Sequence, residues 1–304
     1  MTRPLRFGLI GTGHWARSMH APALAAAADG IEFTAIWGRN PAAAADLAGR
    51  YQVTPHQDLD SFLASVDAVS FAVPPDVQAP IAVRAARAGK HLLLEKPIAL
   101  CEPDADELAS AVSQAQVASV VFFIARFQPD VRAWLDGVTA AGGWAGGHAV
   151  WLGTALRPGS PFNTSWRRDW GGLWDVAPHL ISLLWASLGP VTAVTAEAGP
   201  ADVTHLILHH AGGASAAVTV TLSATGSAAT SCLELWGDAG RSAAPMQRDQ
   251  STAPLRTALA ELAANARSGQ LGHSCDVQFG RAVGQVLASA QQQLDAHRDR
   301  DQPR

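Results

Sequence analysis

Residues 6–16 read Arg-Phe-Gly-Leu-Ile-Gly-Thr-Gly-His-Trp-Ala, and this stretch determines the fold. The apolar residues at its start predict a buried strand, the residues from His14 onwards predict a helix, and glycines form the turn between them. Gly-x-Gly-x-x-Ala at such a turn is typical of dinucleotide binding, because glycines let the backbone approach a pyrophosphate and the helix N-terminus favours its charge. The alternative is a turn with a structural role only.

Strands and helices alternate from this turn to residue 125. Further strands are predicted at 32–37, 68–73, 91–95 and 119–125, with helices at 14–28, 41–51, 81–88 and 104–115. This alternation predicts βαβ units and therefore a parallel, doubly wound sheet in an N-terminal α/β domain, residues 1–125.

From residue 126 the pattern changes, because several strands follow one another. They are predicted at 148–152, 191–198, 203–210, 214–224 and 231–236, with helices at 131–140, 173–188, 255–268 and 276–297. Consecutive strands indicate antiparallel pairing, so residues 126–297 are predicted to form a second, α+β domain. The charged residues 298–304 are predicted to be a disordered tail.

The composition excludes several classes of protein. The chain has 304 residues with 22 Lys and Arg against 26 Asp and Glu, a net charge of −4, so it lacks the basic surface that nucleic-acid binding needs. No apolar stretch approaches the ~18 residues that span a bilayer. Three scattered cysteines, none in a Cys-x-x-Cys pair, indicate neither a disulfide framework nor a zinc site. The first residues lead into a strand rather than a signal peptide, so we predict a soluble, cytoplasmic protein.

Two scarce residue types narrow the chemistry. Tyr51 is the one tyrosine, and the fourth residue after it is Pro55, which excludes a Tyr-x-x-x-Lys dehydrogenase site. Lys90 and Lys96 are the two lysines among the 22 basic residues. Because arginine can replace lysine where a charge suffices but not where a titratable amine is needed, a retained lysine is a candidate for chemistry.

The end of the second predicted strand, Ile36-Trp37-Gly38-Arg39-Asn40, bears on the choice of cofactor. NAD sites usually place an acid here for the ribose hydroxyls, whereas NADP sites place an arginine near the 2′-phosphate. The segment has no acid, Gly38 leaves space and Arg39 offers a forked donor. We therefore predict NADP(H), with NAD less favoured. The alternative role for Arg39 is stacking on adenine.

Glu95-Lys96-Pro97 follows the fourth predicted strand, at the edge where open α/β sheets bind ligands. Pro97 fixes the backbone after Lys96, which helps to aim the lysine. The alternative is a structural Glu–Lys pair at a strand end. Val73 and Pro74 end the third predicted strand at the same edge, and we predict that both contact the cofactor.

A second cluster of candidate residues spans 166–179. Asp175 and His179 are four residues apart, so on one helix their Cβ atoms would lie about 5–6 Å apart on a shared face. Asp175 would then orient His179, whose imidazole suits general acid–base chemistry near neutral pH. The alternatives are a capping Asp with a packing His, or two metal ligands. No third ligand at a suitable spacing supports a metal.

Together, these motifs resemble the Gfo/Idh/MocA oxidoreductase family. The resemblance spans essentially the whole chain and rests on the glycine turn, Ala72-Val73-Pro74-Pro75, Ala88-Gly89-Lys90-His91, Glu95-Lys96-Pro97, Arg126-Phe127-x-Pro129, and Gly171-Gly172 with Asp175 and His179. It implies an N-terminal Rossmann domain and a C-terminal domain with an open, mostly antiparallel sheet. It also implies hydride transfer between a nicotinamide and a sugar, polyol or related small molecule.

The resemblance assigns roles to individual residues. Lys96 matches the family's lysine near the reacting oxygen, and Asp175 and His179 match its Asp and His in the substrate pocket. Trp166 and Arg167 resemble a Trp-Arg pair at the nicotinamide end in NADP-using members. The predicted cofactor contacts are Gly11, Thr12, Gly13, His14, Trp15, Gly38, Arg39, Val73, Pro74, Glu95, Lys96, Arg126, Trp166 and Arg167.

In the predicted reaction, His179 takes the hydroxyl proton during oxidation while Lys96 donates to the same oxygen, and the roles reverse in reduction. The sequence leaves open which of the two is the proton donor. Two other functions on this fold stay open, a sensor of NADP and sugar without turnover and an NAD-dependent glycosidase. Gln78 stands where many family members have His, so the contact made there differs.

Residues 214–224 alternate small and β-branched side chains, which predicts a smooth sheet face. The resembled family often dimerises through such a face, so we predict a homo-oligomer, a dimer or tetramer. The other predicted partner is the small-molecule substrate, with no nucleic acid and no membrane.

Overall fold

The glycine turn follows the central strand of a parallel sheet. The structure is a computed structural model that describes residues 3–27, 30–246 and 251–301. The first sheet consists of β1 (Leu5–Ile10), β2 (Ile31–Trp37), β3 (Thr54–His56), β4 (Ala68–Phe71), β5 (His91–Glu95) and β6 (Ser119–Phe122). The strands lie in the order β3-β2-β1-β4-β5-β6, and all adjacent pairs are parallel. The predicted doubly wound parallel sheet is confirmed, and the strand order reverses between β1 and β4.

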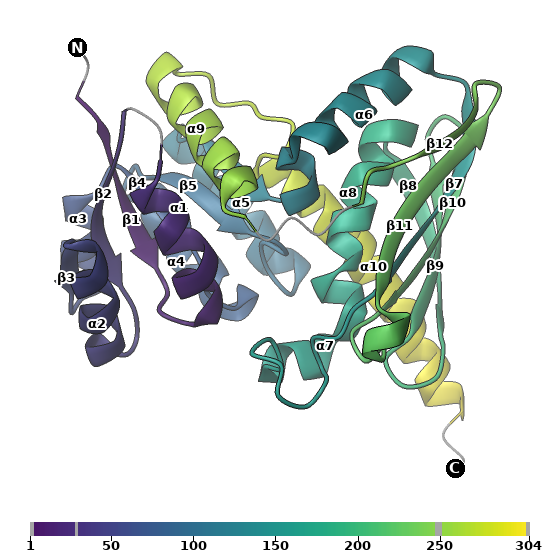
Figure 1. Ribbon diagram of the computed structural model, residues 1–304, viewed down its shortest axis with the longest axis horizontal. Helices are drawn as coiled ribbons and strands as arrows, with labels where there is room; N and C mark the ends of the chain where they lie inside the picture. The colour runs from purple at the N-terminus through teal and green to yellow at the C-terminus, as the bar shows by residue number, and fades with distance from the viewer. Residues whose placement is uncertain (1–2, 28–29, 247–250, 302–304) are drawn as a thin grey trace. The chain divides into compact units, whose positions relative to one another are not determined.

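Helices cover this sheet (Figure 1). They are the π-helix η1 (Ala16–His20), α1 (Ala21–Ala25), α2 (Pro41–Tyr51), α3 (Leu59–Ser65), α4 (Pro75–Arg87), α5 (Glu102–Ala115), the 3-10 helix η2 (Ile124–Phe127) and α9 (Ala253–Ser268). The sequence did not predict β3 or α3. β3 has three residues with Pro55 in the middle, and it pairs with β2 at the sheet edge, where the missing N–H of proline breaks no ladder.

A second sheet follows in the chain. It consists of β7 (Trp144–Leu152), β8 (Val191–Ala198), β9 (Thr204–His210), β10 (Ser215–Thr221), β11 (Thr230–Gly237) and β12 (Gly240–Ala243), in the order β12-β11-β7-β10-β9-β8. β7 and β10 are parallel, and the other adjacent pairs are antiparallel. The predicted mostly antiparallel sheet is therefore confirmed.

One face of the second sheet is buried beneath helices. Its helices are α6 (Pro129–Ala141), α7 (Ser165–Asp175), α8 (Ala177–Leu188) and α10 (Val277–Asp301), with a short 3-10 helix, η3 (Gly226–Ala228). Figure 1 shows α8 and α10 along one face, where α8 contacts β7 and β10. In β9, Leu206 and Leu208 are buried on this face, whereas Ile207 on the other face is 42% exposed. The alternation indicates a sheet with one packed face and one open face.

The chain divides into two compact units, Met1–Phe127 with Gln250–Arg281, and Gln128–Asp249 with Ala282–Arg304. The first unit includes α9, which packs against β5 and β6, so it takes in a late segment that a division at residue 125 assigns to the second domain. Of the predicted tail, 298–301 belong to α10 and 302–304 lie outside the described residues. In the part of the chain that the structure describes, no helix is both long and apolar enough to cross a membrane.

Candidate active site

The glycine turn joins β1 to the first helix and packs against the end of β4. Gly11 has a φ of 125°, and a Cβ there would lie 2.4 Å from the carbonyl oxygen of Ala72, so this position needs glycine. A Cβ at Gly13 would meet no atom within 4 Å, which leaves open space beside the turn. This cradle lies at the start of a helix, whose first N–H groups lack intrahelical partners, and it fits the pyrophosphate of a dinucleotide.

Thr12 and Arg17 link the turn to the following βα unit. A Cβ at Gly38 would lie 2.8 Å from Thr12 Cγ2, so the threonine side chain packs where β2 ends. Arg17 Nε donates to Thr12 O at 3.0 Å, and Arg17 Nη1 donates to Asp46 Oδ2 at 2.7 Å. The structure thus brings two predicted cofactor contacts, Thr12 and Gly38, side by side.

The segment after β2 carries a cation and no acid. Arg39 is exposed, and among the described residues nothing holds its guanidinium. Asn40, the next residue, caps α2 through a hydrogen bond from Ala43 N to its Oδ1 at 3.1 Å. The segment is therefore fixed by the helix cap while the arginine stays available to an anionic group.

The carboxylate of Glu95 is the centre of a hydrogen-bond network that the sequence did not reveal. Trp15 Nε1 donates to Glu95 Oε1 at 2.6 Å, and His20 Nε2 lies 3.0 Å from the same oxygen. The other ring nitrogen of the fully buried His20 lies 2.8 Å from Ser70 Oγ. Trp15 follows the glycine turn and Glu95 ends β5, so the network ties the turn to the strand that precedes Lys96.

Two predicted residues, Val73 and Lys96, follow neighbouring strands at one edge of the first sheet. Val73 follows β4, and its Cγ1 would lie 3.2 Å from a Cβ at Gly11. Lys96 follows β5, is half-buried and precedes a cis peptide bond to Pro97. The carboxyl ends of parallel strands share an edge, which is where open α/β sheets bind ligands.

Arg126 does not directly follow a strand, although the strand predicted at 119–125 would have placed it there. β6 ends at Phe122, so Arg126 belongs to η2 and not to the end of a strand. Its guanidinium carbon lies 5.7 Å from the centre of the Phe279 ring, at cation–π distance. Its role as a cofactor contact stays a prediction.

Asp175 and His179 do not share a helix, so the single helix predicted at 173–188 is wrong. Asp175 is the last residue of α7 and His179 is in the first turn of α8. Pro178 is the reason, because proline lacks an N–H and its ring clashes with the carbonyl four residues earlier, so a helix tolerates it only in the first turn. Both side chains are nevertheless buried, Asp175 to 6% and His179 to 7% exposure.

Asp175 pairs with Arg167. Arg167 Nε donates to Asp175 Oδ2 at 2.8 Å, and the two side chains are 18% and 8% exposed. The guanidinium carbon lies 4.5 Å from the ring centre of Trp166 and 5.4 Å from that of Phe162. In this unit Arg167 is therefore the ion-pair partner of Asp175. Its contact with a cofactor stays a prediction.

His179 stacks on Trp151, which the sequence placed near the end of the predicted strand 148–152. The ring centres are 5.4 Å apart and the planes differ by 24°. Trp151 lies near the end of β7, opposite Ser231 on β11. A strand thereby holds the face of the imidazole, whereas the sequence predicted only Asp175 as an orienting group.

The structure thus brings the predicted residues into two groups. The first unit holds the glycine turn, Gly38, Arg39, Val73, Pro74, Glu95, Lys96 and Arg126; the second holds Trp166, Arg167, Asp175 and His179. Across the described ranges, no three His, Cys, Asp or Glu side chains are grouped so that they could hold a metal ion.

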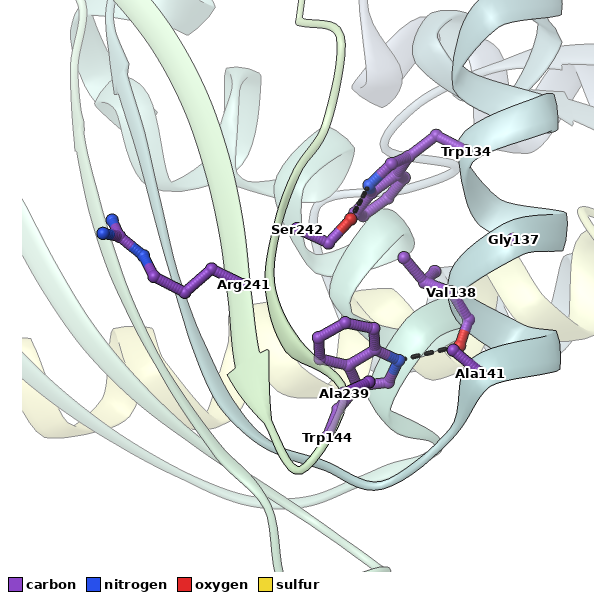
Figure 2. A pocket seen from close by; sticks show the side chains of 8 residues that line it. All are labelled: Trp134, Gly137, Val138, Ala141, Trp144, Ala239, Arg241 and Ser242. Atoms are coloured by element: carbon purple, nitrogen blue, oxygen red, sulfur yellow. Dashed lines mark hydrogen bonds between the residues drawn. The ribbon is translucent and has the colours of Figure 1, made fainter.

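A hollow of about 290 Å³ lies elsewhere in the second unit, between α6 and the β11–β12 hairpin (Figure 2). Trp134 and Trp144 line it, and both indole N–H groups have partners. Trp134 Nε1 donates to Ser242 Oγ at 2.9 Å, and Trp144 Nε1 donates to Val138 O at 2.7 Å.

This hollow is not the candidate site. Arg241 points away from it in Figure 2 and pairs with Glu234 at 2.7 Å. Trp144 begins β7, whereas Trp151, which stacks on His179, lies near the other end of that strand. None of the residues that line the hollow belongs to either group of predicted site residues.

The fold and the glycine turn define a dinucleotide-binding α/β protein with a second unit built on a mixed sheet. The family model "Oxidoreductase family, NAD-binding Rossmann fold" matches residues 5–123, and "GFO/IDH/MocA C-terminal domain" matches residues 140–243. Inositol 2-dehydrogenase of Rhizobium meliloti (strain 1021) is 30% identical over 260 residues, 81% of this chain and 77% of that protein. The chain therefore belongs to the Gfo/Idh/MocA oxidoreductase family.

Other relatives match over different lengths. UDP-N-acetylglucosamine 3-dehydrogenase of Acidithiobacillus ferrooxidans is 31% identical over 128 residues, which cover 42% of this chain and only 40% of that protein. The solved structure of levoglucosan dehydrogenase with NADH and levoglucosan has a TM-score of 0.83 at 21% identity, covering 97% of this chain and 98% of that one. This second likeness is one of fold.

Proposed function

We propose that this protein is an NADP(H)-dependent oxidoreductase that transfers hydride between the nicotinamide and a hydroxyl or carbonyl carbon of a sugar, polyol or related small molecule. The observation that carries the proposal is the edge of the first sheet, where the open cradle at Gly13 and the lysine at 96 both follow strand ends. Relatives named dehydrogenases of inositol and of UDP-N-acetylglucosamine support the substrate class.

The candidate residues have separate roles in the proposed hydride transfer. A bound nicotinamide dinucleotide supplies the hydride acceptor or donor. The Lys96 amine donates a hydrogen bond to the reacting oxygen and stabilises negative charge there. His179 takes the hydroxyl proton in oxidation and returns it in reduction. Trp151 stacks on the imidazole ring of His179. Arg167 neutralises the carboxylate of Asp175, so we assign Asp175 a positioning role and not that of the acceptor of the hydroxyl proton.

The test is a screen of myo-inositol, levoglucosan and other sugars and keto-sugars with NADP(H), followed by absorbance. Lys96→Ala and His179→Ala should each lower kcat by more than ~100-fold on the best substrate. Lys90→Ala is the matched control, because it removes the other lysine and should leave kcat unchanged. Near-normal turnover in both site variants would refute the proposal.

The same assay separates the alternatives. A dehydrogenase changes the absorbance in proportion to the substrate consumed. An NAD-dependent glycosidase releases an alcohol without net change in the cofactor, and a sensor does neither.

The cofactor preference rests on Arg39, the exposed cation after β2. A charge-assisted hydrogen bond to a 2′-phosphate contributes about 1.5–3 kcal/mol. Arg39→Ala should therefore weaken NADP binding by roughly 10–100-fold and leave NAD binding little changed, as measured by fluorescence titration. Tighter binding of NAD than of NADP by the unaltered protein would refute the preference.

We also propose that the protein is a homo-oligomer, a dimer or tetramer, that associates through the open face of the second sheet. Ile207 and Trp236, each 42% exposed, are the exposed large hydrophobic residues among those the structure describes, and both lie on strands of this sheet. Light scattering should give a mass above that of one chain, and Ile207→Glu should lower it. A cytoplasmic location stays a prediction from the sequence.

A further inference from the structure

Gln78 is fully buried in the first turn of α4 and contacts the backbone around Lys96. Glu95 N donates to Gln78 Oε1 at 2.8 Å, and Gln78 Nε2 donates to Glu95 O at 2.8 Å. The same nitrogen lies 3.3 Å from Pro97 O and 3.4 Å from Ile98 O. One side-chain amide therefore holds carbonyl groups on both sides of the lysine.

The pairing of the strands explains why these contacts are needed. β4 pairs with β5 only as far as Ser70 opposite Leu93, whereas β6 pairs with β5 up to Phe122 opposite Glu95. Beyond Leu93, no residue of β4 pairs with β5. Buried backbone groups need a partner, and the Gln78 amide supplies an acceptor and a donor where the strand has ended.

We infer that Gln78 is a positioning residue for Lys96, which fixes the peptide that presents the amine to the substrate. The inference rests on the proposed role of Lys96 and adds a residue that acts through it. An amide suits the task because it places an acceptor beside a donor without charge. Glutamate would present acceptors alone to three carbonyl oxygens, and methionine would present neither group.

The test is a double-mutant cycle between the two residues. Gln78→Met should lower kcat by about 10–100-fold with a smaller effect on KM, because displacing a reacting group by about 1 Å has effects of this size. In the Lys96→Ala background, Gln78→Met should cause no further loss, since the group that it positions is gone. Equal losses in both backgrounds would overturn the inference.

A control separates positioning from loss of stability. Val83 is also buried in α4 and makes none of these hydrogen bonds, so Val83→Ala should lower the melting temperature while keeping kcat. If Gln78→Met does not fold, Gln78→Asn replaces it in the cycle, because it keeps the amide and shortens the side chain by one methylene. A Val83→Ala variant that loses as much kcat as the Gln78 variant would also overturn the inference.

A second measurement needs no substrate. Reductive methylation with ¹³C-formaldehyde labels lysine amines, and the two lysines give two side-chain NMR signals. Gln78→Met should shift or broaden the Lys96 signal and leave the Lys90 signal unchanged. An unchanged Lys96 signal refutes the positioning role. The failure of the proposed function has a different signature, since Lys96→Ala would then retain full turnover while the NMR shift persisted.

Discussion

The two units hold their candidate residues in different ways. In the first, Glu95 ends β5 and Lys96 follows it, and the Gln78 amide bonds to the backbone around them. In the second, Asp175 and His179 lie on separate helices and are held by side chains, Arg167 and Trp151 respectively. The first group is thus held through its backbone, by strand pairing and by the Gln78 amide, whereas the second group is held by contacts between side chains.

The largest effect is expected in the second unit, at the Arg167–Asp175 pair. Asp175→Ala leaves a mostly buried guanidinium without its partner, and breaking such a pair typically costs about 3–5 kcal/mol. Denaturant unfolding should show a loss of this order in the free energy of unfolding.

The control for this prediction is the exposed pair between Arg241 and Glu234 in the same unit, where Arg241 is 76% exposed. Arg241→Ala should change the stability little, because solvent screens exposed pairs. If both variants lost the same stability, the second unit would not depend on its buried pair.

This contrast also explains what could be predicted from the sequence. The apolar stretches before Gly11 and Lys96 predict strands. Parallel strands bring their carboxyl ends to one edge of the sheet, independently of the contacts between their side chains. The parallel sheet and the group of residues at its edge therefore followed from local pattern. The three-residue β3 did not, because its Pro55 argues against a strand unless the edge position is known.

The contacts within each group could not be predicted in this way. His20 and Ser70 are 50 positions apart, and Gln78 and Glu95 are 17 apart, so their pairing appears only when the strands are assembled. The spacing of Asp175 and His179 suggested one helix, and Pro178 was a local signal that a helix begins there instead. Read in that way, the sequence would have placed the two residues on different helices.

A smaller effect is expected for the carboxylate in the first unit. Glu95→Gln keeps one oxygen for Trp15 Nε1 but removes the charge from the contacts with Trp15 and His20. Hydrogen bonds to charged groups exceed neutral ones by about 1 kcal/mol, so the free energy of unfolding should fall by about that amount.

Glu261→Gln is the matched control, since Glu261 lies 3.0 Å from His273 in the same unit but is 30% exposed, against 13% for Glu95. We expect the smaller loss there. A larger loss for Glu261→Gln would show that burial of the Glu95 network contributes nothing to the first unit.

The smallest effect is a pH dependence that each unit contributes through one histidine. Burial lowers the pKa of His91 and of His210 below the ordinary value of 6.5. His91 Nδ1 accepts from Ala118 N at 3.0 Å, and His210 Nδ1 donates to Gly189 O at 2.7 Å. His210 Nε2 is buried with no hydrogen-bond partner among the described residues, so a proton there would be unsatisfied.

The folded state is therefore more stable with each of these imidazoles neutral than with it protonated. Between the lowered pKa and 6.5, the unfolded chain binds more protons than the folded one. The contribution of each histidine to the free energy of unfolding is therefore fully present above pH 6.5 and is lost as the pH falls below it. His91→Asn and His210→Asn keep an acceptor for Ala118 N and a donor for Gly189 O, and they remove the titration. The free energy of unfolding of each variant, measured from pH 7.5 to 5, should decline less steeply than that of the unaltered protein. Parallel curves for one variant would assign the pH dependence to the other unit, and parallel curves for both would show that neither buried histidine contributes to it.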